Sequence, residues 1–215
     1  MPDAGSYIYS GNPEGRKWFR QTKIHQTLTL NGKNTAYAPK LLKWHASEDL
    51  DVLVVENAGY ENLTHRRAVF FVEKRYFIVV DEAIGPGVGD VDIHFQLAPG
   101  EQANFNHTKK YVNSGFTEGW NVFVHSLDQK GLEMQQEEGQ VSFEYTKKEP
   151  RPAFRYRLKK KKQTDQIRFV SLVIPYEKEI PLIKVEVLGQ PKVGASDLQL
   201  EINENGKKKI IGYKL

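Results

Sequence analysis

The stretch Ala68–Val80, AVFFVEKRYFIVV, gives the clearest indication of the fold in this sequence. Two runs of β-branched and aromatic residues flank the charged triplet Glu73-Lys74-Arg75, which is the pattern of a β-hairpin. Both runs are apolar at every position, so both faces of each strand need to be covered. We therefore predict two central strands that lie between other layers of the protein.

Shorter runs of the same kind continue on both sides of this hairpin, separated by turn residues such as Asn31-Gly32 and Pro99-Gly100. No convincing apolar stripe recurs at helical spacing. The sequence therefore predicts an all-β fold, a large antiparallel β-sandwich that forms one domain over residues 1–215. The expected strands are residues 7–9, 25–30, 40–45, 52–57, 68–72, 76–80, 92–97, 122–127, 141–145, 154–158, 167–175, 182–188, 198–202 and 209–213.

The composition excludes several kinds of site. The chain has 215 residues, a formal net charge of +4 and no cysteine. Without cysteine there can be no disulfide, thiolate zinc site or cysteine nucleophile. No apolar run is long enough to span a membrane, and the first residues lack the basic and apolar regions of a signal peptide. The mild positive charge fits a solvated surface or, where it clusters, an anionic polymer.

A second informative stretch is Arg16–Asn31, RKWFRQTKIHQTLTLN. We interpret residues 25–30 as a strand in which Leu28 and Leu30 face the core and His25 lies on the opposite face. Asp3 lies upstream in a short lead that contains a glycine. A carboxylate and an imidazole placed in this way suit a shared metal ion. An aspartate in a turn and a hydrogen-bonded histidine would show the same pattern.

Two motifs relate these residues to a known family: Asp3-x-Gly5-x-Tyr7 and Arg16-x-Trp18-Phe19-Arg20-x-Thr22-x-x-His25-x-Thr27-Leu28. Together they resemble the start of the C-terminal β-domain of the heparinase II/III-like polysaccharide lyases, and the resemblance is continuous to about Pro99. It implies that Asp3 and His25 bind a divalent metal such as Zn²⁺. It also implies a third ligand from a motif just upstream of residue 1, which is missing from this chain.

The same resemblance implies an activity for the longer protein. Lyases of this kind cleave heparan sulfate or a related acidic polysaccharide by β-elimination at uronate residues, which requires a base, an acid and donors for the developing charge. In the family an Asn, a Tyr and a His supply these groups, from an upstream α/α-toroid domain and the motif that precedes this chain. We therefore expect the isolated chain to be inactive and the full-length enzyme to be periplasmic or secreted.

His65 is the candidate catalytic residue within this chain. It lies in Thr64-His65-Arg66-Arg67, at the mouth of the central hairpin, where a histidine beside two arginines could face an anionic sugar. The simpler interpretation is an ordinary histidine at the start of a strand.

Two groups of residues are candidates for substrate binding. In an extended stretch Trp18 and Arg20 share a face, and with Arg16 they could stack on and pair with a sulfated sugar; Trp18 could equally anchor the segment to the core. Arg155, Arg157 and Lys159 point outward from a strand whose apolar residues face inward. This basic strand could bind heparan sulfate, or could be a solvated edge strand neutralised by nearby glutamates.

Two other functions remain open at this point. One is a non-catalytic module that binds sulfated polysaccharide or only stabilises a catalytic partner. The other is nucleic-acid binding through residues 155–162, which we disfavour because no groove-entering helix or stacking motif is present.

Overall fold

The computed structural model of the protein describes residues 1–100 and 102–215. Its largest sheet has eight strands, in the order β2 (Pro39–His45), β3 (Leu50–Tyr60), β4 (Leu63–Val72), β5 (Tyr76–Ile84), β14 (Ile167–Tyr176), β9 (Asn121–Ser126), β8 (Tyr111–Asn113), β7 (Asn104–Asn106). A four-stranded sheet has the order β1 (Leu28–Leu30), β6 (Gly89–Gln96), β13 (Ala153–Lys160), β10 (Glu133–Glu137). A three-stranded sheet contains β15 (Ile183–Val187), β16 (Asp197–Glu204) and β17 (Lys207–Lys214), and a ribbon pairs β11 (Gln140–Glu144) with β12 (Lys147–Pro150).

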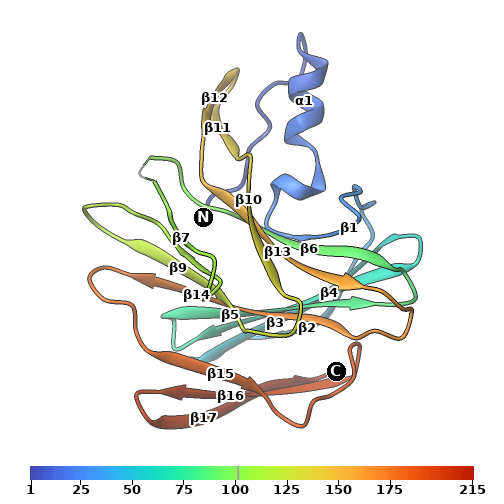
Figure 1. Ribbon diagram of the computed structural model, residues 1–215, viewed down its shortest axis with the longest axis vertical. Coiled ribbons are helices and arrows are strands. Elements are labelled where there is room, and N and C mark those ends of the chain that lie inside the picture. The colour runs from blue at the N-terminus through green and yellow to red at the C-terminus, as the bar shows by residue number, and fades with distance from the viewer. Residues whose placement is uncertain (101) are drawn as a thin grey trace.

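The eight-stranded sheet is the middle layer (Figure 1). One core fills the space between it and the four-stranded sheet, and a second core separates it from the three-stranded sheet. In the β4–β5 hairpin, Phe70 and Ile78 belong to the second core, whereas Phe77 and Val79 pack against the first. The prediction of central strands covered on both faces is confirmed, as is the all-β antiparallel sandwich, which here carries a third sheet.

The N-terminal segment differs from the prediction. Residues 7–9 do not form a strand, and the strand expected at residues 25–30 is only β1. Helix α1 (Pro13–Phe19) and the 3₁₀-helix η1 (Thr22–Ile24) occupy the stretch instead. Asn12 caps α1, since its side chain accepts a hydrogen bond from Gly15 N at 2.8 Å, and Pro13 fits the first helical position. Both α1 and the β11–β12 ribbon project from the sandwich (Figure 1).

Four further strands, β7, β8, β10 and β12, were not predicted. They are short and polar, so they show little of the apolar alternation that marks the longer strands. They are extended because they pair with neighbouring strands. A single domain over residues 1–215 remains a prediction. Among the described residues, no helix has the length and apolar character needed to cross a membrane.

Candidate functional site

Asp3 and His25 meet where residues 1–26 pack against the sandwich, a region that we call the N-terminal edge. Asp3 Oδ1 lies 2.6 Å from His25 Nδ1, and Asp3 Oδ2 accepts a hydrogen bond from Gly5 N at 3.2 Å. The expectation that His25 lies on a strand face is wrong: its backbone N–H bonds to Thr22 O and closes η1, so it precedes β1. Gly5, at φ +76°, lets the lead pass close to the ribbon, because an added Cβ would lie 2.2 Å from Ser142 O.

The pair has the geometry of a hydrogen-bonded carboxylate and imidazole. Partial burial opposes ionisation of Asp3, but the hydrogen bond and the charge of His25 outweigh it and hold the Asp3 pKa below its ordinary value. Two ligands of one tetrahedral Zn²⁺ lie about 3.3 Å apart, so a shared metal would require the two atoms to separate. The described residues contain no cluster of three possible ligands. Two donors of suitable chemistry are therefore present, and a metal would need at least one more.

Two side chains fix the lead that carries Asp3. Gln26 Nε2 donates to Pro2 O at 3.3 Å and to Gln96 O at 3.2 Å, which ties the lead to the end of β6. Arg151 donates from Nη1 to the same Pro2 O at 2.7 Å. Arg151 is only 5 % exposed, and its Nε and Nη2 have no partner among the described residues. Burial lowers the pKa of Arg151 to about 10, against the attraction of the Asp3 charge.

His65 lies in a buried ionic cluster on the face of the central sheet that packs against the four-stranded sheet. His65 Nε2 is 2.6 Å from Asp81 Oδ1, and Arg67 Nε donates to the same oxygen at 2.7 Å. Arg67 also donates from Nη1 to Gln26 O at 2.5 Å. The cluster therefore connects the central hairpin to the residue that follows His25.

The hairpin register explains this cluster. Val72 pairs with Tyr76 at the turn, and the same register places Arg67 opposite Asp81. Opposite charges that face each other across neighbouring strands attract. Asp81 is fully buried, which opposes its ionisation, but the charges of Arg67 and His65 and their hydrogen bonds hold its pKa below the ordinary value. His65 is itself 8 % exposed. A direct role of His65 with substrate remains a prediction; its observed contact is with Asp81.

Arg67 reaches a groove of about 470 Å³ at the open edge between the two larger sheets. Apolar side chains make up most of its wall, including Phe77, Phe95 and the exposed Trp120. Met1 and Gln26 also line this groove, together with Arg67. The groove, the Arg67 cluster and the Asp3–His25 pair thus adjoin one another along the N-terminal edge.

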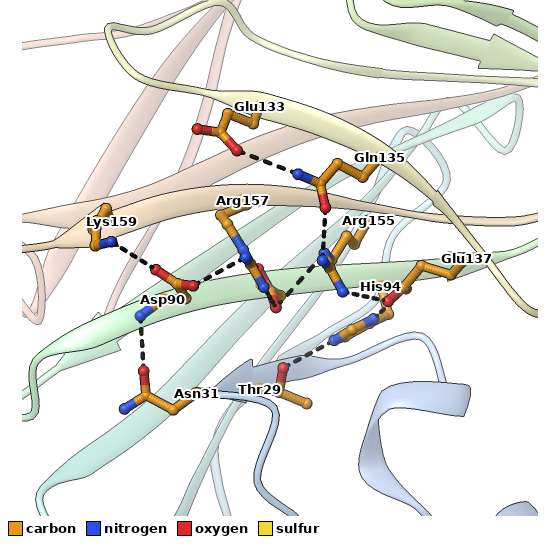
Figure 2. A network of polar contacts seen from close by, with 11 residues as sticks. Thr29, Asn31, Asp90, His94, Glu133, Gln135, Glu137, Arg155, Arg157 and Lys159 are labelled. Carbon is orange, nitrogen blue, oxygen red and sulfur yellow. Dashed lines mark hydrogen bonds and ion pairs between the residues drawn. The ribbon is translucent and has the colours of Figure 1, made fainter.

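The basic strand does face outward, but its charges are paired. Arg157 donates to both carboxylate oxygens of Asp92, at 2.6 and 2.8 Å, and also contacts Asp90. Lys159 is mostly exposed and lies 3.7 Å from Asp90. Figure 2 shows Arg157 and Lys159 on either side of Asp90.

Arg155 continues this network toward α1. It pairs with Glu137 at 2.8 Å, and the other oxygen of Glu137 is 2.6 Å from Nδ1 of the buried His94. His94 Nε2 in turn lies 2.9 Å from Thr29 Oγ1 (Figure 2). The network is close to charge-balanced, so it leaves little free positive charge for a polyanion. The binding of substrate by Arg155, Arg157 and Lys159 remains a prediction.

The other predicted contacts lie in and beside α1. Trp18 is half-buried and packs edge-on against Phe19, with ring centroids 4.8 Å apart. Arg16 donates to Tyr9 O at 2.7 Å, and Arg20 is exposed just after the helix. Because the stretch is helical, Trp18 and Arg20 do not share a face as they would in a strand. Substrate binding by Arg16, Trp18 and Arg20 remains a prediction, but the shared face expected for Trp18 and Arg20 is absent.

Sequence reasoning missed three residues of this edge: Asp81, Arg151 and Trp120. Asp81 could have been found, because the hairpin turn fixes which residue faces Arg67. Arg151 and Trp120 lie in loops or at strand ends, where nothing in the local pattern shows what they will contact. The capped start of α1 could also have been found from Asn12 and Pro13.

Comparison with known proteins places these features in a family. Residues 1–184 match the family model described as heparinase II/III-like, C-terminal. A heparin-sulfate lyase from Pedobacter heparinus is 37% identical over 215 residues, which are 98% of this chain but 32% of that protein. A heparin-sulfate lyase from Bacteroides stercoris is 36% identical, over 100% of this chain and 33% of that protein.

Solved structures show the same relation. The heparan sulfate lyase HepC from Pedobacter heparinus superimposes with a TM-score of 0.91 at 36% identity, and the heparinase III product of BT4657 with a TM-score of 0.93 at 32% identity. Each match covers 100% of this chain and 34% of the other. The chain therefore spans about a third of the length of the relatives that it matches.

Proposed function

The chain belongs to the heparinase II/III-like family, as its C-terminal domain, and from this premise we propose that it forms part of a lyase that cleaves heparan sulfate or a related acidic polysaccharide. The observation that carries the proposal is its similarity along the whole chain to proteins named heparin-sulfate lyase, at 36–37% identity. Those proteins are about three times as long. The proposed enzyme therefore includes an upstream domain, an α/α-toroid, besides the residues described here.

The proposed reaction is β-elimination at a uronate residue. A base removes the proton next to the carboxylate, donors stabilise the charge that develops there, and an acid protonates the leaving oxygen. In the proposed enzyme these groups come from the upstream domain and from the motif directly before this chain. The domain described here would support that site through the edge that carries Asp3, His25 and Arg67.

Among its own residues, Arg67 has the clearest connection to that edge. It is held by Asp81 and bonded to the backbone that follows His25, so it fixes the position of the predicted metal ligand. His65 contacts the same carboxylate of Asp81. Binding of the glycan by the α1 residues and the basic strand is part of the proposal, although the ion pairs of Arg155 and Arg157 weaken it.

A divalent metal such as Zn²⁺ is also part of the proposal. Asp3 and His25 would provide two ligands, and a third would come from the polypeptide before residue 1. Bound there, the metal would supply a rigid link between the two parts of the enzyme. Metal analysis of the protein encoded by the whole gene tests this: a bound metal whose removal lowers the Tm in the parent but not in His25→Ala supports it. A metal-free protein, or equal loss of Tm in both, would contradict it.

The location of the full-length enzyme is a proposal as well. Its substrate is an extracellular polysaccharide, so we propose a periplasmic or secreted enzyme. Fractionation of the native host would test this directly.

The experiment for the activity compares two proteins on heparan sulfate and follows the ultraviolet absorbance of unsaturated uronate. The protein encoded by the whole gene should produce the signal, and the 215-residue chain should not. Activity of the short chain that disappears in His65→Ala and His25→Ala would instead place the chemistry in this domain. Absence of activity in the longer protein, together with binding of heparan sulfate by the short chain, would favour a non-catalytic polysaccharide-binding module.

A further inference from the structure

We propose that the surface around Met1 is the docking surface for the polypeptide that precedes Met1 in the full-length protein, with Arg151 as its buried anchor and Trp120 as its exposed one. This inference rests on the proposed function, because it needs an upstream domain. It adds the surface on which that domain sits and the residues that hold it.

The first observation is the guanidinium of Arg151. Among the residues that the structure describes, its Nη1 alone has a hydrogen-bond partner, the backbone oxygen of Pro2, and Arg151 is only 5 % exposed. A buried charge with unused donors is costly unless oxygen acceptors reach it. Because Nη1 already bonds to the backbone of Pro2, residues just before Met1 are placed to bring carbonyl or carboxylate oxygens to Nε and Nη2.

The second observation is the groove beside Met1. Its wall is mostly apolar and includes the partly exposed side chains of Phe77 and Phe116 besides the buried Phe95. Trp120 stands at this wall with 66% of its surface exposed. Exposed apolar walls of this kind, rimmed by polar groups, mark surfaces that another polypeptide covers. Tryptophan and arginine are also the residues that most often anchor protein interfaces.

The loop that carries Trp120 is already held in place. The side chain of the next residue, Asn121, accepts hydrogen bonds from Ser114 Oγ at 2.7 Å and Phe116 N at 2.9 Å and donates to Phe116 O. A fixed loop loses little conformational entropy when a partner covers it. The surface is therefore pre-organised for docking.

The relatives indicate the occupant. This chain accounts for about a third of their length. The family match and the match to the Bacteroides stercoris protein both include residue 1. Polypeptide that continues upstream from Met1 starts inside the groove and next to Arg151, so it covers this surface without a long linker. A partner of unrelated sequence would have to compete with it.

Oxidation footprinting of tryptophan tests the docking, because the chain carries a matched control. Trp44 on β2 is 62% exposed, much like Trp120, but lies five strands away in the central sheet, roughly 24 Å at ordinary strand spacing. In the 215-residue chain both should react at similar rates. In the protein encoded by the whole gene, Trp120 should lose most of its reactivity while Trp44 keeps it. Equal reactivity of Trp120 in both proteins, or equal protection of the two tryptophans, would overturn the proposal.

Arg151→Met tests the buried anchor, with Lys207→Met on the far sheet as the control for loss of one positive charge. In the 215-residue chain Arg151→Met should leave the Tm nearly unchanged or raise it, whereas in the longer protein it should lower the Tm or split one unfolding transition into two. The same shift in both proteins would overturn the role of Arg151. If the longer protein is an active lyase and Trp120 stays reactive, the docking proposal fails alone; if no coding sequence precedes Met1, the proposed function fails as well.

Discussion

The N-terminal edge and the C-terminal sheet of this domain satisfy their polar groups in different ways. Among the described residues, buried side-chain atoms without hydrogen-bond partners occur at the edge, on Gln96, Gln140 and Arg151, but none occurs in residues 177–215. The others lie on Tyr76, Ser126, Arg155 and Ser171, in the two larger sheets. The sheet of β15, β16 and β17 buries an apolar face, including Leu200 and Ile202, and keeps its ion pairs at the surface. The C-terminal sheet thus has the features of a complete outer layer. The N-terminal edge has the features of an interface with another part of the protein.

The ionic contacts show the same contrast. At the edge, Asp81 is fully buried between His65 and Arg67. At the sheet, Glu204 pairs with Arg75, whose side chain is 47% exposed. Removing one partner of a buried pair leaves an uncompensated charge, whereas a surface pair is screened by solvent. The two regions should therefore respond to mutation very differently.

The largest effect is expected for Asp81→Ala. It leaves Arg67 and His65 without their shared carboxylate, so we expect a loss of about 3–5 kcal/mol in the free energy of unfolding. Urea unfolding of the 215-residue chain measures it. Asp51→Ala, which removes a partly exposed partner of Lys74, should change the midpoint far less. Equal losses in the two variants would remove the contrast between buried and surface pairs.

Leu200→Ala should cost slightly less and act on the other region. Leu200 is fully buried in the second core, and truncation of such a side chain costs about 2–5 kcal/mol. The exposed Ile210 on the same sheet provides the control, since Ile210→Ala should have almost no effect. A negligible loss for Leu200→Ala would show that the C-terminal sheet does not share the stability of the rest of the domain.

A smaller effect should appear as a pH dependence at the four-stranded sheet. Burial opposes ionisation of Glu137, but its contacts with His94 and Arg155 hold its pKa below the ordinary value of 4.5. A depressed carboxyl pKa contributes stability that is complete above that value and is lost as the pH falls through the folded-state pKa. The parent chain should therefore lose stability below about pH 4.5, and Glu137→Gln should flatten that slope. An unchanged slope in the variant would show that Glu137 is not among the groups responsible.

The smallest effect is expected for Glu204→Gln. The pair with Arg75 is partly exposed, so its loss should cost less than about 1 kcal/mol and should shrink further at high salt. Thermal unfolding at two salt concentrations measures this. A loss as large as that of Asp81→Ala would mean that the surface pairs of the C-terminal sheet are structural after all.

The fold could be predicted because its signals are local. Apolar runs such as residues 68–72 and 76–80 specify strands by themselves, and the lack of polar positions in them indicates a sheet covered on both sides. The short polar strands could not be predicted, because β10 is extended only through its pairing with β13. Residues 13–19 were missed because a helix of two turns shows too little periodicity, although Asn12 and Pro13 mark its start.

The candidate site could be predicted only in part. The motifs pointed to Asp3 and His25, and these side chains do meet, but no local pattern shows that Arg151 would lie against Pro2 from 149 residues away. Long-range contacts of this kind depend on how the layers close. The charge on Arg155 and Arg157 was visible, whereas its neutralisation by Asp92 and Glu137 depends on strand pairing.

Hydrogen exchange of the 215-residue chain and of the protein encoded by the whole gene tests the central contrast most directly. We predict slower exchange in the longer protein for amides of residues 1–26, 114–122 and 139–151, because the upstream polypeptide covers that edge. Exchange over residues 183–214 should be the same in both proteins. Identical exchange at the N-terminal edge, or protection centred on the C-terminal sheet, would contradict the assignment of this edge as the interface with the upstream domain.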